Sequence, residues 1–177
     1  MSVLARLLER PGTGPIIEAM RHRHVGQVLA IERAVYPKPW TAQVFHDELD
    51  QMRAGRRHYL VARVGRQVIG YAGLMFVPDE AHVTNIAVHT GHRRYGVATR
   101  LLLDLAGVAI GRGCGAWTLE VRTSSTGAQR LYQAFGFVPA GIRKQYYEGR
   151  EDAIVMWCHD IQGPAYAERM RELSCAR

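Results

Sequence analysis

The sequence predicts a mixed α/β fold, with a mixed β-sheet that carries helices on both faces. Two observations predict it. Short strand-like apolar runs alternate along the chain with longer segments whose apolar residues recur at helical spacing. The chain also has 177 residues, of which 47% are hydrophobic and 22% charged, so it is long enough for one soluble domain with a sizeable core.

The first half of the chain is expected to hold a strand, two helices and then three strands. The first helix stops before Pro37 and Pro39, Thr41 is a good N-cap for the second, and Gly65-Arg66 marks a hairpin. The expected elements are a strand at 16–20, a helix with Val25, Val28, Leu29, Glu32 and Val35 at its periodic positions, a helix with Val44, Phe45 and Leu49, and strands at 58–64, 67–77 and 81–88.

The second half is expected to alternate helices and strands and to end in a hairpin. Gly111, Gly113 and Gly115 should end the helix that crosses between two strands. The expected elements are a helix at 97–110, a strand at 116–122, a helix at 126–135, and strands at 137–143 and 153–157. The predicted order is therefore β-α-α-β-β-β-α-β-α-β-β.

The expected domain spans residues 16–160, between an N-terminal extension at 1–15 and a C-terminal tail at 161–177. Residues 1–10 read as a short helix or a frayed end, because charged residues interrupt any signal-peptide core. The tail places Tyr166, Met170 and Leu173 at helical spacing, which leaves a docking helix and a disordered segment both open.

Charge and composition narrow the class of partner. The formal charge of +7 favours an anionic partner, but the basic residues are scattered and no nucleic-acid motif accompanies them. No apolar run reaches the ~18 residues that span a membrane. Three widely spaced cysteines predict neither disulfides nor a zinc site and suit the cytoplasm, and the histidines show no metal-ligand spacing. We expect a cytoplasmic monomer or weak dimer without a metal.

The most informative segment is the end of the strand at 84–88 and the start of the helix that follows it. After a polar turn, Arg93-Arg94-Tyr95-Gly96-Val97-Ala98 opens an apolar helix. Free backbone N–H groups, the positive end of the helix dipole and two arginines then meet at one place. Gly96 and Ala98 allow close approach to the backbone. The pattern predicts a site for an anion, most plausibly a diphosphate.

These six residues meet the pattern [QR]-x-x-G-x-[GA], and the chain resembles the GCN5-related N-acetyltransferase (GNAT) superfamily. Its closer resemblance, from about residue 16 to residue 157, is to the RimI-type family of bacterial ribosomal-protein-alanine N-acetyltransferases. The blocks that carry this resemblance are Pro39-Trp40, Asn85-Ile86-Ala87-Val88, Leu119-Glu120-Val121-Arg122, Leu131-Tyr132 with Phe135-Gly136-Phe137, Tyr146-Tyr147, and Gly149-Arg150-Glu151-Asp152-Ala153-Ile154.

The resemblance implies the GNAT fold, with a central, mostly antiparallel sheet that is splayed where acetyl-CoA binds. It implies that the N–H of Val88 polarises the thioester and that Ser125 stands where the family usually has Asn. The cofactor-binding residues it implies are Ile86, Ala87, Val88, Arg93, Arg94, Tyr95, Gly96, Val97, Ala98, Thr99 and Ser125.

Two residues are candidates for proton transfer. Glu120 shares a strand face with Thr118 and Arg122, where a carboxylate should lie in a cleft or be paired. The residues alone leave a base and a structural ion pair about equally open, and the family position favours the base. Tyr132 lies in a helical stripe with Leu131 and Phe135 that is typical of a core, and the resemblance implies that it is the general acid.

The resemblance also implies an acceptor. Tyr36, Trp40, Tyr146 and Tyr147 belong to aromatic loops that would wall the amine site, although each could instead pack at the sheet edge. We expect direct transfer from acetyl-CoA, in a ternary complex, to a protein N-terminal amine, in particular the alanine of a small-subunit ribosomal protein. The alternatives are a broader N-α or lysine acetyltransferase and a non-catalytic module that binds acyl-CoA or docks on the ribosome.

Overall fold

The computed structural model describes residues 14–176. Most of the predicted N-terminal extension, including the segment 1–10 that reads as a short helix or frayed end, lies outside the described residues. None of the described helices is long and apolar enough to cross a membrane.

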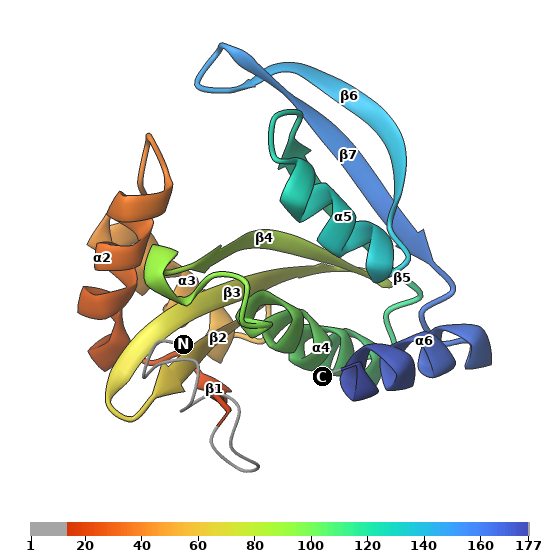
Figure 1. The fold of residues 1–177 in the computed structure, drawn as a ribbon, viewed down its shortest axis with the longest axis horizontal. Coiled ribbons are helices and arrows are strands. Elements are labelled where there is room, and N and C mark those ends of the chain that lie inside the picture. The colour runs from red at the N-terminus through yellow and green to blue at the C-terminus, as the bar shows by residue number, and fades with distance from the viewer. Residues whose placement is uncertain (1–13, 177) are drawn as a thin grey trace. The chain divides into compact units, whose positions relative to one another are not determined.

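The predicted order of strands and helices is confirmed, and one more helix follows it (Figure 1). The elements are β1 (Ile16–Ala19), α2 (Val25–Val35), α3 (Ala42–Arg53), β2 (Arg57–Val64), β3 (Gln67–Val77), β4 (Glu80–Val88), α4 (Val97–Gly111), β5 (Ala116–Arg122), α5 (Thr126–Ala134), β6 (Val138–Tyr147), β7 (Glu151–His159) and α6 (Pro164–Cys175), with short 3-10 turns at His22–His24 and Thr90–His92. The last two strands run longer than predicted because their pairing reaches Tyr147 and Glu151. The predicted tail folds largely as α6.

The strands form a seven-stranded mixed sheet with the order β1-β2-β3-β4-β5-β7-β6. The pairs β1–β2, β5–β7 and β6–β7 are antiparallel, whereas β4 and β5 are parallel, and α4 supplies the crossover that a parallel pair requires. The β4–β5 register runs from Glu80↔Ala116 to Val83↔Leu119. Glu120 follows that register and pairs on the other side with Val155 of β7.

The chain divides into two compact units. One contains the described residues up to Gly73 together with Asn85–Asp104, and the other contains Leu74–Thr84 together with the chain from Leu105 onward. Strands β3 and β4 and helix α4 each pass from one unit into the other.

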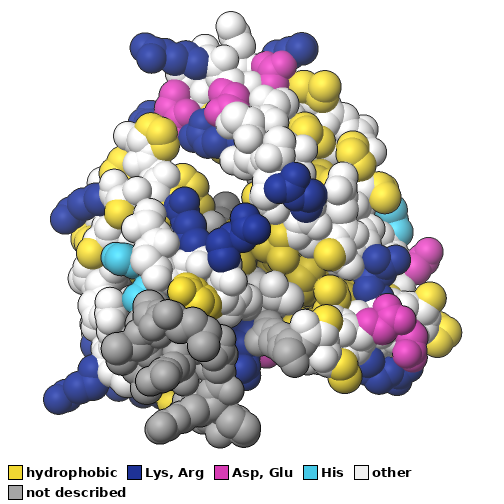
Figure 2. Space-filling view, in the orientation of Figure 1, with side chains coloured by type: hydrophobic (Ala, Val, Ile, Leu, Met, Phe, Trp, Pro, Cys, Tyr) yellow, Lys and Arg dark blue, Asp and Glu magenta, His cyan; other side chains and the backbone are white. Residues whose placement is uncertain are grey.

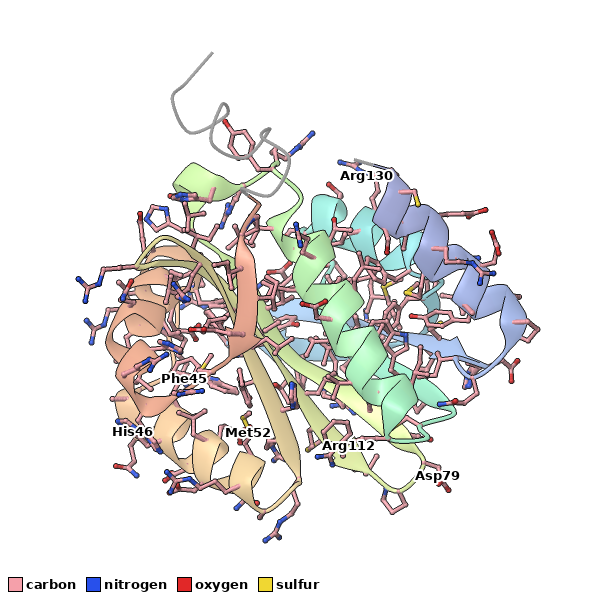
Figure 3. The ribbon with its side chains drawn as sticks, turned by 90° about the horizontal axis from the view of Figure 1, so that it is seen from below. Phe45, His46, Met52, Asp79, Arg112 and Arg130 are labelled. Atoms are coloured by element: carbon pink, nitrogen blue, oxygen red, sulfur yellow. The ribbon has the colours of Figure 1, made fainter. Side chains whose placement is uncertain are left out.

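Helices cover both faces of the strands in the first unit. Gly70 and Tyr71 of β3 point to opposite faces because neighbouring residues alternate in a strand. A Cβ on Gly70 would lie 3.2 Å from Val97 of α4, so this helix packs closely on that face. Tyr71 belongs to the hydrophobic cluster with α2 and α3, in which Phe45 is fully buried. Figure 3 shows Phe45 on the inner side of α3 and His46 on its outer side.

The second unit is packed around Trp117 of β5, which is fully buried. Its ring lies 4.7 Å from that of Phe137, 6.1 Å from that of Phe135 and 6.4 Å from that of Tyr166 on α6. Through this last contact, α6 packs against the rest of the unit. At another point of the unit the N–H of Gly115 donates to the carbonyl of Asp79, 2.8 Å away, and the Arg112 guanidinium lies 4.1 Å from the centre of the Phe76 ring. Figure 3 labels Asp79 and Arg112 in this region.

Candidate active site

The predicted anion site forms a tight turn in the first unit, between β4 and α4. Arg94 has a φ of 68° and Gly96 a φ of 70°, so the turn twice enters the left-handed region that favours glycine. The first helical bond of α4 runs from the N–H of Arg100 to the carbonyl of Gly96, at 3.0 Å. The N–H groups of Val97, Ala98 and Thr99 precede this bond and have no partner within the helix.

The charges at this turn fit a diphosphate. Arg93, Arg94 and Tyr95 are exposed, and the first turn of α4 carries no acidic residue. Arg93 also donates from Nε to the carbonyl of Val88, at 3.4 Å, which links the turn to the end of β4. These residues therefore fit the diphosphate of acetyl-CoA, through backbone N–H groups, the helix dipole and two cationic side chains. On the face shown in Figure 2, other Lys and Arg side chains lie at several separate places.

The end of β4 is held in place on both sides. Ala87 and Val88 are buried, and the N–H of His89 donates to the carbonyl of Ile69, at 2.9 Å. The Ile86 carbonyl accepts a hydrogen bond from the Tyr36 hydroxyl, at 2.7 Å. Tyr36, predicted as a wall of the amine site, is thus brought to the predicted thioester strand within the first unit. The polarising role of the Val88 N–H stays a prediction.

Trp40, the other aromatic residue predicted in this loop, is half-buried. Its ring lies 5.5 Å from that of Phe45, and its backbone N–H donates to Glu32, at 2.9 Å. Tyr36 is therefore held against β4, and Trp40 is held against α2 and α3, within the first unit.

The second unit contains a pocket of about 370 Å³ on the face of β5 that lies opposite Trp117. The pairs His82↔Thr118, Thr118↔Trp157 and Glu120↔Val155 bring side chains of three strands onto this one face. The pocket is lined by Met75, His82, Thr118, Glu120, Arg143, Tyr146, Val155 and Trp157. Two of the predicted site residues, Glu120 and Tyr146, are thus together in one cavity.

Glu120 is paired on both of its oxygens. His82 Nε2 lies 3.0 Å from Oε2, and Arg143 Nη1 lies 3.1 Å from Oε1. The Glu120 side chain is 8% exposed, that of His82 20%, and that of Arg143 55%. The hydrogen bond from His82 is the main cause that holds the pKa of Glu120 below its ordinary value, and burial acts in the opposite direction. Glu120 is therefore an ionised carboxylate, both in a cleft and in an ion pair.

The low pKa of Glu120 changes what this carboxylate can do. A doubly paired carboxylate is a weak proton acceptor at neutral pH, so it is better suited to orienting His82 than to removing a proton directly. An ionised carboxylate has no proton to donate, so His82 Nε2 must carry the hydrogen of their hydrogen bond. When the imidazole is neutral, its lone pair is therefore on Nδ1, where it can accept a proton.

Tyr146 and Tyr147 differ in their surroundings. Tyr146 is exposed, lines the pocket, and has the Arg143 guanidinium 5.4 Å from its ring centre. Tyr147 donates from its hydroxyl to the carbonyl of Glu120, at 3.1 Å, and its ring lies 4.1 Å from the Arg122 guanidinium. Burial raises the pKa of Tyr147 to about 12. Its observed contact supports the backbone at Glu120, and its contact with substrate stays a prediction.

Tyr132 and Ser125 both lie on or beside α5. Tyr132 is 6% exposed, and its ring packs edge-on at 5.9 Å against that of Phe137, which also contacts Trp117. It therefore belongs to the aromatic cluster of the second unit, and its general-acid role stays a prediction. Ser125 is the N-cap residue of α5, and its backbone N–H donates to the carbonyl of Arg122, at 3.0 Å. Its contact with the cofactor also stays a prediction.

His82 lines the site but was not predicted as a site residue. Its strand was predicted, but nothing in the spacing of residues showed that His82 would face Glu120, because their contact depends on the β4–β5 register. A polar side chain inside an otherwise apolar strand was the available signal.

Comparison with known proteins shows the family of the chain. The sequence model of the Acetyltransferase (GNAT) family matches residues 25–137. The chain is 35% identical over 131 residues to the [ribosomal protein bS18]-alanine N-acetyltransferase of Escherichia coli strain K12, covering 71% of this chain and 84% of that protein. It is 33% identical over 147 residues to the protein of the same name from Haemophilus ducreyi, covering 80% and 97%.

Solved structures show the same fold. The crystal structure of the ribosomal-protein-S18-alanine N-acetyltransferase from Escherichia coli superposes with a TM-score of 0.74 at 30% identity, over 82% of this chain and 94% of that one. Ard1 from Thermoplasma volcanium superposes with a TM-score of 0.76 at 23% identity, over 82% and 97%. The chain therefore belongs to the acetyltransferase (GNAT) family. It is an acetyltransferase that uses acetyl-CoA as its acyl donor.

Proposed function

We propose that this acetyltransferase modifies the N-terminal α-amine of a protein, and that its acceptor is the N-terminal alanine of a small-subunit ribosomal protein. The relatives from Escherichia coli and Haemophilus ducreyi, which carry that activity in their names, support the choice of acceptor. The observation that carries the proposal is the His82–Glu120 pair, half-buried at the wall of a small pocket in the second unit.

The reaction needs an amine without its proton. An α-amine has a pKa near ~8, so much of it is protonated at neutral pH and must lose one proton before attack. His82 Nδ1 accepts that proton, directly or through one water molecule, and the Glu120 carboxylate stabilises the imidazolium that forms. Arg143 binds the second oxygen of Glu120 and adds to the effect of His82, which is the main group that lowers the pKa of this carboxylate.

The amine nitrogen then bonds to the carbonyl carbon of the thioester, and the carbon–sulfur bond breaks. The departing thiolate takes a proton, for which the Tyr132 hydroxyl is the proposed donor. A thioester is already activated, so alignment and a fixed N–H donor at the carbonyl oxygen can supply most of the rate. In this proposal the turn at Arg93–Ala98 binds the diphosphate, and the N–H of Val88 is that donor.

The aromatic residues Tyr36, Trp40 and Tyr146 are proposed to contact the acceptor chain. Rigid aromatic rings beside the amine would select the first residue of the acceptor by the size of its side chain, and a narrow site would favour alanine.

A thiol-release assay tests the proposal. The purified protein is mixed with acetyl-CoA and one of four peptides. Three begin with a free alanine, serine or methionine, and the fourth has an alanine whose α-amine is blocked and, further along, an internal lysine. The proposal predicts CoA release with the free alanine peptide and none with the blocked one. Transfer to the internal lysine would show a lysine acetyltransferase. Binding of acetyl-CoA without turnover on any peptide would show a non-catalytic acyl-CoA-binding module.

A further inference from the structure

Helix α2 carries a buried carboxylate for which the proposed reaction gives no role. Glu32 is 2% exposed and lies in the hydrophobic cluster of the first unit, beside Val28, Leu29 and Ile31. Burial raises the pKa of this carboxyl group above its ordinary value, while the N–H of Trp40 acts to lower it. A buried carboxylate rarely adds more stability than an apolar side chain of similar volume. Its presence here therefore points to a role other than stability.

The contacts of Glu32 hold both ends of one loop. Its backbone carbonyl accepts from the N–H of Tyr36, at 2.9 Å, and its side-chain Oε1 accepts from the N–H of Trp40, also at 2.9 Å. The segment from Tyr36 to Trp40 contains Pro37 and Pro39, whose rings already limit its conformation. Glu32 thus hydrogen-bonds to the backbone at both Tyr36 and Trp40, the two aromatic residues of the loop.

A second set of contacts fixes Glu32 itself. The Tyr71 hydroxyl donates to its Oε2, and the Tyr71 ring lies edge-on to that of Phe45, at 5.6 Å. The Phe45 ring in turn packs against that of Trp40, at 5.5 Å. Glu32, Trp40, Phe45 and Tyr71 therefore form a closed circuit of contacts between α2, α3, β3 and the loop.

The loop reaches the end of β4 through Tyr36. Its hydroxyl donates to the Ile86 carbonyl, at 2.7 Å, two residues before Val88. A shift of the loop would change this bond and the position of both aromatic side chains. The contacts of Glu32 described above involve no residue of the turn from Arg93 to Ala98.

We propose that Glu32 is a positioning residue, which fixes the Tyr36–Trp40 loop in the conformation that receives the acceptor peptide. This role rests on the proposed function, in which Tyr36 and Trp40 contact that peptide. Glu32 acts through the loop and sets the affinity for the acceptor, while leaving the affinity for acetyl-CoA unchanged.

The test compares three variants. Glu32→Leu keeps the volume and removes both side-chain oxygens but leaves the backbone bond to Tyr36, so the KM for the alanine peptide should rise about tenfold or more, with the KM for acetyl-CoA unchanged. Glu32→Gln should largely restore the peptide KM, because its oxygen can accept from Trp40 and its NH₂ can donate to the Tyr71 oxygen. Val28→Ala is the matched control, since it removes core volume from the same helix and should lower the melting temperature without changing either KM.

Hydrogen exchange of the segment 36–45 gives a second measurement. Glu32→Leu should speed exchange there, and Val28→Ala should change it less. The proposal is overturned if wild type is active and Glu32→Leu keeps its peptide KM, or if Glu32→Leu and Val28→Ala raise both KM values alike. If wild type transfers acetyl to no peptide, the proposed function itself fails, and the positioning role fails with it.

Discussion

Replacing His82 by Gln separates proton acceptance from structural pairing at the Glu120 site. The Gln side chain can donate an amide hydrogen bond to Glu120, as the imidazole does over 3.0 Å, but it cannot accept a proton at neutral pH. The pocket should therefore stay folded and polar while the proposed base is lost.

The exposure of the two partners of Glu120 sets the expected magnitudes. A positioned proton acceptor contributes about 10² to 10⁴ to the rate, so kcat of His82→Gln should fall by about that factor. The Arg143 side chain is 55% exposed, and ion pairs of such side chains are worth about 0.2 to 1 kcal/mol, which corresponds to at most about fivefold. His82→Gln should thus be far more damaging than Arg143→Gln.

Steady-state kinetics with the alanine peptide measure both variants, at saturating acetyl-CoA and over a range of pH. The KM for acetyl-CoA should stay within about twofold of wild type in each, because neither residue belongs to the turn at Arg93–Ala98. Melting temperatures close to that of wild type would show that the variants fold. A His82→Gln protein that folds and keeps wild-type kcat would refute the reasoning, as would an equal loss in Arg143→Gln.

Three further variants test other parts of the site. Gly96→Val should raise the KM for acetyl-CoA about tenfold in steady-state assays. A β-branched residue is strained by about 1–2 kcal/mol at a φ of 70°, and its side chain would block the approach of the diphosphate to the backbone N–H groups. An unchanged KM would contradict the proposal that this turn binds the diphosphate. Tyr132→Phe should lower kcat more than it weakens binding of acetyl-CoA, and full kcat would remove the general-acid role. Tyr147 has a pKa raised to about 12, so the stability it contributes is present below its unfolded pKa of about 10 and is lost as the pH rises through 12. The tyrosinate absorbance step that wild type shows and Tyr147→Phe lacks should therefore lie near pH 12, and a missing step near pH 10 would contradict the burial argument.

The order of the elements could be predicted because its signals are local. Prolines after α2, the Thr41 cap, the Gly65-Arg66 turn and the glycines after α4 each mark a boundary without reference to distant residues. The alternation of side chains along β5 likewise predicted that Trp117 and Glu120 lie on opposite faces of the strand.

The contacts of the site could be predicted only in part, because they join distant parts of the chain. His82 meets Glu120 through a parallel pairing that forms across helix α4. Glu32 was one of the periodic positions of its helix, but its partner Tyr71 is 39 residues away. The spacing of α6 was helical, but its contact with the ring of Trp117, through Tyr166, could not be predicted from that spacing. In each case the pattern showed which face a residue occupies and not what lies opposite.

The most direct test of the central claim is mass spectrometry of protein N-termini in cells that make this protein and in cells that lack it. The proposed function predicts one small-subunit ribosomal protein whose N-terminal alanine is acetylated only in cells that make the acetyltransferase. In cells that lack it, the Arg143→Gln variant should restore this acetylation and the His82→Gln variant should barely do so. Ribosomal N-termini that are identical in both cells would contradict it, as would a change confined to internal lysines.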